Sequence, residues 1–316
     1  MFVAKAKATR AAYGETLLEL IAEGHDIVAV EADLAGSTTT GKVGEVYPER
    51  FFNAGIAEAN MVGVAAGHAL AGQTAFTGSF AVFGTGRVYD QIRNTVCYNM
   101  LDVKIAPTHS GVTVGADGGS HQMLEDIALM RVLPHMRVLV PADYTAAKAA
   151  VRYAATNPGP FYVRLGRAEV PAVYGPDGIT GVDAPDVTKA FVVREGADVT
   201  IAACGIEVAE AIKAAEMLEA EGIDAEIIDV MCIKPLDVET IVRSVSKTGR
   251  MVTAEEHSVL GGMGSAVSEV LSEVLPTPTR RVGVADQFGT SGTPDELIKH
   301  FSLDAASIAA AAKELL

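Results

Sequence analysis

Short apolar runs alternate with longer amphipathic stretches along most of this sequence. In its first half, strands are favoured by apolar runs at residues 26–31, 74–80, 103–107, 137–140 and 161–165. Apolar residues at helical spacing lie between them, at residues 10–22, 57–71, 87–98, 121–131 and 144–155. Short buried strands separated by helices of about 10–15 residues are typical of βαβ units. The alternation therefore predicts an α/β fold with a mostly parallel sheet.

The alternation is interrupted between Pro171 and Pro185. This stretch is rich in Pro and Gly and shows no period, which is typical of a linker or a domain boundary. Beyond it, strands are expected at residues 199–203, 225–230, 251–254 and 281–285, and helices at 208–221, 238–245, 263–275 and 305–315. We predict two α/β domains, a first at 1–175 and a smaller one at 189–316, joined by a linker at 176–188.

The charge balance narrows the classes of partner. The chain carries 25 Lys and Arg against 40 Asp and Glu, a formal net charge of −15. Nucleic acid selects clusters of basic residues, and no such cluster stands out here, so we expect no nucleic-acid partner. No apolar stretch approaches the roughly 18 residues of a membrane span, and the first residues do not resemble a signal peptide. We therefore expect a cytoplasmic protein without a membrane partner.

Neither the cysteines nor short motifs predict a metal or nucleotide site in this chain. The three cysteines lie in or beside apolar runs, which favours buried thiols: Cys97, Cys204 and Cys232. The segment 36–43 nearly matches a P-loop, but Val43 replaces the hydroxyl residue that binds Mg²⁺. The spacing of His109 and His121 matches no known metal pattern.

Two features carry candidate chemistry. Glu58 stands at the first turn of the predicted helix 57–71, where an acid can simply stabilise the helix dipole. The loop 107–122 follows a predicted strand and holds three polar residues among glycines: His109, Asp117 and His121. Open α/β sheets bind ligands at the carboxyl ends of their strands, and His and Asp can transfer protons there. The alternative is a polar loop whose groups only satisfy one another.

Several blocks of the sequence, taken together, resemble the C-terminal half of transketolase. In chain order they are ADL (32–34), GIAE (55–58), GSFAVF (78–83), PTHSGVTVGADGGSHQ (107–122), VLVPAD (138–143), YVRLGR (162–167) and EEHSVLGGMGSAVSEVL (255–271). The resemblance covers nearly the whole chain. It implies a pyrimidine-binding domain at 1–175, a transketolase C-terminal domain at 189–316, and thiamine diphosphate as cofactor.

The resemblance also implies roles in binding that cofactor. Glu58 matches the glutamate that hydrogen-bonds the aminopyrimidine N1′ and so helps to activate the thiazolium C2 as a nucleophile. Phe80 and Phe83 match the aromatic pair that lines the pyrimidine pocket. The family often has a further aromatic residue shortly afterwards, where this chain has Gly-Thr-Gly at 84–86. The third wall of the pocket is therefore left open.

For the substrate, the resemblance implies a phosphate grip at the mouth of the channel. Its positions are matched by Arg10, Ser37, His109 and Arg167, with Arg167 preferred to Arg164. Asp117 matches the residue that binds the C2 hydroxyl of the acceptor, and His121 matches a catalytic histidine close to the donor carbon. Asp33 matches a position that faces either a substrate hydroxyl or a partner chain.

The resemblance implies a partner as well. The Gly-Asp-Gly…Asn motif that holds the divalent metal has no match here, and full-length transketolase is about twice as long. A second, N-terminal subunit would then carry the diphosphate and Mg²⁺ or Ca²⁺, in an α2β2 heterotetramer with closed symmetry.

The leading hypothesis is the pyrimidine-binding subunit of a two-component transketolase in pentose phosphate metabolism. It would transfer a two-carbon ketol unit from a ketose or ketose phosphate to an aldose or aldose phosphate. The β subunit of a 2-oxo acid dehydrogenase E1 component is an alternative, as are a deoxyxylulose-phosphate synthase fragment and a catalytically silent regulatory subunit.

Overall fold

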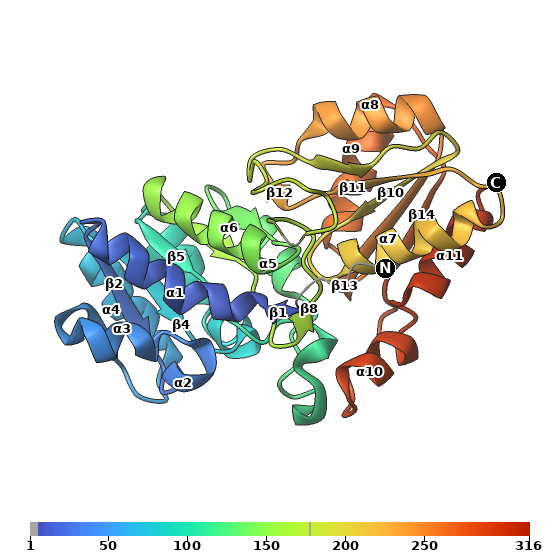
Figure 1. The fold of residues 1–316 in the computed structure, drawn as a ribbon. Coiled ribbons are helices and arrows are strands. Elements are labelled where there is room, and N and C mark those ends of the chain that lie inside the picture. The colour runs from blue at the N-terminus through green and yellow to red at the C-terminus, as the bar shows by residue number, and fades with distance from the viewer. Residues whose placement is uncertain (1–5, 177) are drawn as a thin grey trace.

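The short strands form two separate sheets, each covered by helices (Figure 1). The computed structural model describes residues 6–176 and 178–316. The strands of the first sheet are β2 (Ile27–Glu31), β3 (Phe51–Asn53), β4 (Thr74–Gly78), β5 (Val103–Ile105), β6 (Arg137–Leu139), β7 (Phe161–Val163) and β12 (Cys232–Lys234). They lie in the order β12-β6-β7-β5-β4-β2-β3, and every pair is parallel except β12 with β6.

The second sheet follows the Pro- and Gly-rich stretch. Its strands are β9 (Phe191–Arg194), β10 (Val199–Ala203), β11 (Ala225–Asp229), β13 (Met251–Ser258) and β14 (Thr279–Val284). They lie in the order β14-β13-β10-β11-β9, and only β9 runs antiparallel to its neighbour. The predicted α/β class with mostly parallel sheets is confirmed.

Helices cover both faces of the sheets. In the first half they are α1 (Thr9–Ala22), α2 (Ala35–Thr38), α3 (Gly41–Val46), α4 (Glu58–Leu70), α5 (Asp126–Arg131) and α6 (Tyr144–Thr156). In the second half they are α7 (Glu207–Glu219), α8 (Val238–Thr248), α9 (Met263–Val274), α10 (Pro294–His300) and α11 (Ala305–Lys313). Helices α1 and α6 pack together on one face of the first sheet, and α4 packs on the other. None of the helices in the described part of the chain combines the length and apolar character needed to cross a bilayer.

Two predicted helices were wrong in extent. Most of the stretch predicted as a helix at 87–98 forms wider π-helical turns, η3 (Gln91–Cys97), and a second π-helical segment, η2 (Val82–Gly86), precedes it. The helix predicted at 121–131 begins only at Asp126. The preceding loop instead forms a short 3₁₀ segment, η4 (Val112–Asp117), because glycines with positive φ at 115 and 118 interrupt helical geometry.

Other elements have sequence signals that are too short for periodicity to detect. Strand β12 has three residues, lies after the predicted linker, and still pairs with β6 of the first sheet. The division at 176–188 therefore stays a prediction. The 3₁₀ turn η1 (Pro48–Arg50) and the antiparallel pair β1 (Lys7–Ala8) with β8 (Glu169–Val170) also escape the pattern.

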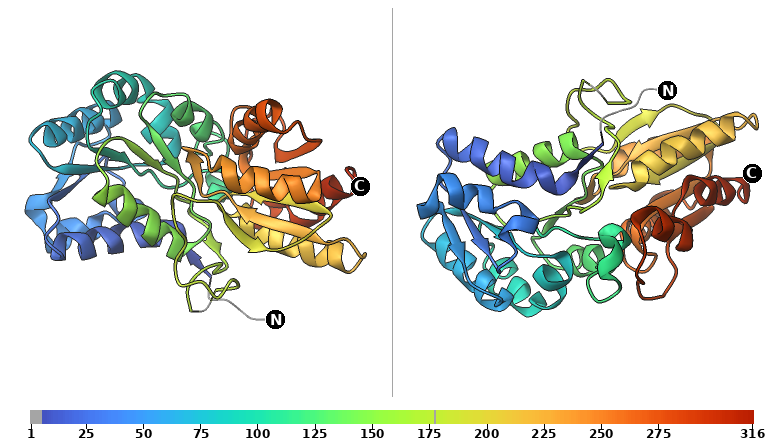
Figure 2. Two further views of the ribbon diagram at one scale, coloured as in Figure 1. Left: turned by 90° about the horizontal axis from the view of Figure 1, so that it is seen from above. Right: turned by 60° about the horizontal axis from the view of Figure 1, so that its bottom comes forward.

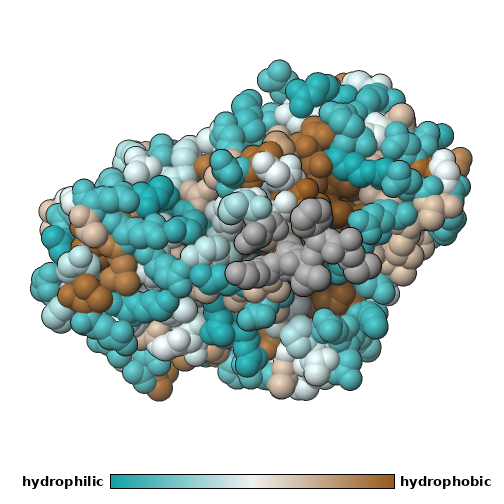
Figure 3. All heavy atoms as spheres, viewed as in Figure 1, coloured by the Kyte–Doolittle hydropathy of each residue, from teal (hydrophilic) through white to brown (hydrophobic). Residues whose placement is uncertain are grey.

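The C-terminal region lies against the polar loop of the first region. Figure 2 shows the red segment that carries α10 beside the green segment around η4, and the two are in contact. The face of the molecule in Figure 3 is mostly hydrophilic, with scattered hydrophobic side chains, as the acidic composition leads one to expect.

Candidate active site

The candidate residues come from segments at one edge of the first sheet. Strands β2, β4, β5 and β7 run parallel, so their carboxyl ends lie at the same edge. The segments after these strands carry Ser37, Phe80, His109 and Arg167, in that order. Glu58 is the first residue of α4, which packs against β4. The topology thus explains how residues far apart in the sequence converge.

Two phenylalanines and two histidines form a compact aromatic group. Phe80 is buried and stacks on His109, with 3.8 Å between the ring centroids and 21° between the planes. Phe83 lies 6.2 Å from Phe80 and meets His121 edge-on at 5.5 Å. An isolated bridge between Phe80 and Thr108 aligns the segments that follow β4 and β5. The structure therefore brings together four of the side chains predicted to form the site.

His109 is held neutral by its surroundings. Burial, together with the positive charges of Arg10 and Arg167, lowers the pKa of the imidazole to about 3. Its Nδ1 lies 2.8 Å from the Thr108 hydroxyl. The residue also has a φ of 62°, which is uncommon for a side chain other than glycine. A neutral imidazole in a fixed orientation can donate or accept one hydrogen bond at a substrate oxygen.

Arg10 and Arg167 approach each other because the start of α1 is hydrogen-bonded to the segment that follows β7. The backbone N–H of Arg10 donates to the Gly166 carbonyl at 3.3 Å, and that of Gly166 donates to the Thr9 hydroxyl at 2.7 Å. The Arg10 guanidinium donates to the Ser37 carbonyl at 2.7 Å. Burial and the neighbouring charge of Arg167 lower the pKa of Arg10. Two neighbouring guanidinium groups favour an anionic ligand between or beside them.

A cavity of about 580 Å³ opens beside these arginines. Its lining comes from both regions of the chain and includes Arg10, Arg167, residues 113–116 and residues 292–294. Asp117 lies at the same loop, with a carboxylate oxygen 3.8 Å from the Arg167 guanidinium. Both side chains are partly exposed, so their polar atoms remain accessible to a ligand.

Glu58 has a partner that sequence reasoning missed. The Glu58 side chain is only 5% exposed, and its Oε1 accepts a hydrogen bond from Arg87 Nη1 at 2.9 Å. The Arg87 guanidinium also lies over the Phe83 ring, 4.3 Å from the centroid. Arg87 comes directly after the Gly-Thr-Gly stretch at 84–86, where the family's additional aromatic residue is lacking. Nothing in the local sequence marks it as a partner of Glu58.

Asp33 lies apart from the other candidates. It is exposed, with a φ of 63°, and exchanges hydrogen bonds of 3.1 Å with Asn53 at the end of β3. Within the described residues it makes no hydrogen bond to the rest of the predicted set. Its predicted role toward a substrate hydroxyl or a partner chain stays a prediction.

Residues of the second region contact the polar loop 107–122 and hold it in place. Glu256, on β13, accepts a hydrogen bond from the backbone N–H of Thr113 at 2.6 Å. A side chain in place of Gly111 would overlap the Glu256 carboxyl group, with a Cβ only 2.1 Å from its carbon. The Gln122 amide donates to the carbonyls of Val112 and Thr290, at 3.0 and 2.9 Å. Glu256 and Gln122 lie in blocks that the family resemblance includes, but only the structure shows what they contact.

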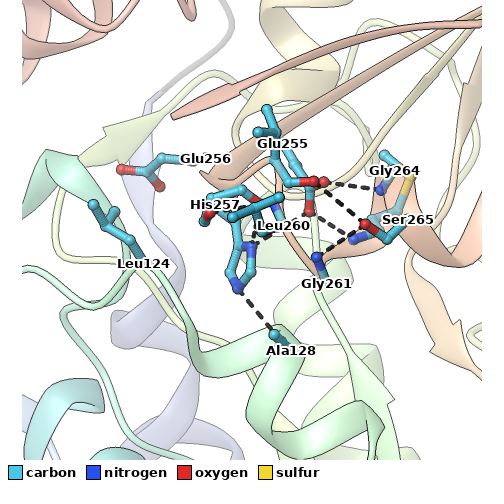
Figure 4. Close-up of polar contacts among 12 residues, drawn as sticks. Leu124, Ala128, Glu255, Glu256, His257, Leu260, Gly261, Gly264 and Ser265 are labelled. Carbon is cyan, nitrogen blue, oxygen red and sulfur yellow. Dashed lines mark hydrogen bonds and ion pairs between the residues drawn. The ribbon is translucent and has the colours of Figure 1, made fainter. Parts of the chain in front are cut away.

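The neighbours of Glu256 on β13 are also committed to backbone groups (Figure 4). Glu255 accepts hydrogen bonds from the N–H groups of Met263 and Gly264 at the start of α9, at 2.6 and 2.9 Å. The Nδ1 of His257 donates to the Ser258 carbonyl at 2.7 Å, which leaves Nε2 to accept the Ala128 N–H of α5 at 3.4 Å. These contacts join the two regions at the base of the loop.

Arg164 belongs to this interior and not to the cavity. It is buried and donates to Asp126 at 2.7 Å and to the Glu256 carbonyl at 2.9 Å. Burial would raise the pKa of Asp126, but the charge and the hydrogen bond of Arg164 outweigh it and hold that pKa below its usual value. No three His, Cys, Asp or Glu side chains in residues 6–176 and 178–316 come together as a metal site.

Comparisons with known proteins agree over nearly the whole chain. A family model for the transketolase pyrimidine-binding domain matches residues 5–173, and one for the transketolase C-terminal domain matches residues 188–308. The chain is 46% identical to a putative transketolase C-terminal section of Methanocaldococcus jannaschii, covering 96% of this chain and 94% of that protein. It is 43% identical to a 6-deoxy-6-sulfo-D-fructose transketolase subunit, SqwH, of Clostridium sp. strain MSTE9, covering 97% and 94%.

A solved structure is similar as well. It is described as a split gene transketolase, inactive beta4 tetramer, and matches with a TM-score of 0.88 and 49% identity over 99% of each chain.

Proposed function

Because this chain belongs to the transketolase family, as a section with its pyrimidine-binding and C-terminal domains, we propose that it is one subunit of a two-component transketolase. In this proposal it transfers a two-carbon ketol unit from a ketose or its phosphate to an aldose or its phosphate. The observation that carries the proposal is the convergence of a buried carboxyl group, an aromatic pair and two histidines at one sheet edge.

The residues present fit thiamine diphosphate. An aminopyrimidine ring needs a carboxyl group at one ring nitrogen and aromatic faces to stack on. Glu58 supplies the buried carboxyl group, and Phe83 supplies a ring whose face already lies against the Arg87 guanidinium. When bound, thiamine diphosphate supplies a nucleophilic carbon and an electron sink. Glu58 holds a proton at the pyrimidine nitrogen, and Phe80 and Phe83 bind the ring.

The remaining residues act on the sugar. His121, edge-on to Phe83, moves a proton at an oxygen of the donor, and neutral His109 hydrogen-bonds a substrate oxygen. Arg10 and Arg167 bind an anionic group at the far end of the substrate, with Ser37 and Asp117 beside them. A pair of arginines at the cavity favours a sugar phosphate or sugar sulfonate over a simple 2-oxo acid, whose single carboxylate is next to the reacting carbon and leaves no anionic group at the far end.

A partner chain completes the proposed enzyme. The similar proteins described as a C-terminal section and as a subunit support a separate N-terminal subunit that holds the diphosphate and Mg²⁺ or Ca²⁺. The similar solved chain is described as inactive in a tetramer of beta chains alone, which supports a requirement for that second subunit. We propose an α2β2 assembly. The cytoplasmic location and the place in pentose phosphate metabolism stay predictions.

The test is reconstitution. This chain is co-expressed with a candidate N-terminal subunit, and ketol transfer from a ketose phosphate to ribose 5-phosphate is measured with thiamine diphosphate and Mg²⁺. Activity should require both chains and should fall by about 10²-fold or more in Glu58→Gln, because a proton-transfer group is lost. Near-normal turnover of Glu58→Gln would contradict the proposal. Cofactor binding without transfer would direct the search to 2-oxo acids.

A further inference from the structure

Arg87 contacts both Glu58 and Phe83, the two residues proposed to bind the pyrimidine ring of the cofactor. Its guanidinium donates to the buried Glu58 carboxylate at 2.9 Å and lies over the Phe83 ring at 4.3 Å. Roughly half of the Arg87 side chain is exposed, at 51%, against 5% for Glu58. The cation therefore reaches in from the surface and covers the carboxylate.

These two contacts are of the kinds that a bound aminopyrimidine would make. A guanidinium is planar, donates hydrogen bonds in its plane and stacks on aromatic faces. Two flat groups cannot lie on the same face of Phe83 and bind the same oxygen of Glu58 at the same time. We propose that Arg87 occupies part of the pyrimidine site in the free subunit and is displaced when thiamine diphosphate binds. The inference rests on the proposed function, since it takes Glu58 and Phe83 to be cofactor ligands.

The Arg87 hydrogen bond also competes with the cofactor for the Glu58 carboxylate. The Arg87 guanidinium donates to Glu58 Oε1 at 2.9 Å. In the proposed function, the pyrimidine nitrogen would share its proton with this same carboxylate. As long as Arg87 is paired with Glu58, the carboxylate is committed to the arginine. The ion pair thus keeps a buried carboxylate compensated in the free chain and must separate before Glu58 can act.

The structure offers a place for the displaced side chain. A hollow of about 600 Å³ lies beside η2 and includes Phe83, Gly86, Arg87, Met123 and Glu125 in its lining. A side chain at Gly86 would have only the tip of Met123 nearby, at 3.7 Å, so the space next to Arg87 is open. Glu125 is exposed in this hollow and provides a second carboxylate for the arginine.

The experiment compares Arg87→Gln with Arg93→Gln. Arg93 is an exposed arginine on η3 whose side chain, within the described residues, bonds only its neighbour Asn94, so it is a matched control. Thiamine diphosphate affinity is measured by calorimetry on the complex of this chain with its N-terminal subunit, in the presence of Mg²⁺. Arg87→Gln should bind the cofactor about three- to tenfold more tightly, because apparent affinity rises with the fraction of sites that are competent to bind. Arg93→Gln should bind as the wild type does.

A second readout uses the free subunit without cofactor. Arg87→Gln should lower its melting temperature, since Glu58 then stays buried without a cationic partner, while the double variant with Glu58→Gln should recover part of the loss. Weaker or unchanged cofactor binding by Arg87→Gln would overturn this inference alone and would identify Arg87 as a wall of the pocket or as a bystander. A wild-type complex that binds no thiamine diphosphate would overturn the proposed function and, with it, this inference.

Discussion

The candidate site at the edge of the first sheet and the polar groups at the end of β13 use the same residue types in opposite ways. At the site, Arg167 and Asp117 are partly exposed and 3.8 Å apart, so their polar atoms can exchange partners. At the end of β13, Glu255, Glu256 and His257 are buried and bonded to backbone groups. The first arrangement is available to a ligand, whereas the second holds the polar loop 107–122 in place.

The comparison has a practical lesson. Arginine, acid and histidine in one motif do not by themselves indicate catalysis, because Arg164 and Arg167 belong to the same block and have different surroundings. Arg164 lies in the interior with Asp126, and Arg167 lines the cavity. Exposure and the identity of the partner separate the two roles.

The largest effect is expected on the supporting side. Arg164→Met should lower the free energy of unfolding by about 3–5 kcal/mol, because it leaves Asp126 and Glu256 buried without their cation. Urea unfolding of the purified subunit at pH 7 measures the change. The double variant with Asp126→Asn should be less damaged than the sum of the single variants. A loss below about 1 kcal/mol would show that the interior carboxylates do not depend on Arg164.

At the cavity, loss of an arginine should affect substrate binding and not stability. Arg167→Gln should raise KM for a sugar phosphate by about 10- to 100-fold, since a charge-assisted hydrogen bond to the anionic group is lost. Its unfolding free energy should stay within about 0.5 kcal/mol of the wild-type value. Arg93→Gln serves as the control for loss of an exposed charge. If KM were unchanged, the proposed anion site would lie elsewhere.

Glu31 and His109 should respond to pH in opposite directions. Burial raises the pKa of Glu31 to about 7, although the Thr38 and Thr40 hydroxyls partly offset it. Folding therefore favours the protonated acid, and this contribution to stability is lost as pH rises from about 4.5 to about 7. The pKa of His109 is lowered from 6.5 to about 3, so its contribution is lost as pH falls through that window.

The variants Glu31→Gln and His109→Asn separate these two contributions. Each should flatten the pH dependence of the unfolding free energy in its own window, by on the order of 1 kcal/mol. Chemical denaturation between pH 4 and pH 8 measures both curves. If the slope of the wild-type curve between about pH 4.5 and pH 7 persisted in Glu31→Gln, other groups would account for it. Asp229 is one such group, because burial raises its pKa to about 7 as well.

The smallest effect is expected at Glu207. This residue is fully buried at the start of α7, and within the described residues neither carboxylate oxygen has a hydrogen-bond partner. Burial, with the nearby charge of Glu256, raises its pKa well above the usual range, which favours the protonated, neutral acid. Glu207→Gln should therefore change the unfolding free energy by less than about 1 kcal/mol in a thermal melt. A loss above 2 kcal/mol would reveal a polar contact that the neutral acid makes.

Much of the fold follows from local patterns. Strand β2 and helix α6 differ from their predicted extents by a single residue at one end. Strand β12 was missed because three residues carry no period, and it pairs with β6 only after the chain has passed into the second region. The shortened helix α5 has another cause: glycines with positive φ at 115 and 118 shape the loop before it, and Glu256 and Gln122 hold that loop through contacts that no local pattern predicts.

The candidate site divides in the same way. The loop with His109, Asp117 and His121 could be recognised because polar residues among glycines follow an apolar run. Arg87 could not, since its contact with Glu58 spans 29 positions and depends on how the segment that leads into η3 packs beside α4. Asp33 was grouped with the site by resemblance, but its hydrogen bonds are to Asn53.

The local pattern of apolar residues is enough to predict the alternation of strands and helices, and with it which edge of the first sheet carries the polar loop. The reason is that periodicity reports which face of an element is buried, and parallel strands place their carboxyl ends together. The partner of each charged group emerges only when the chain is folded: Asp126 for Arg164, Glu58 for Arg87. Pairing between distant side chains depends on packing geometry, which is not encoded in any local stretch of the chain.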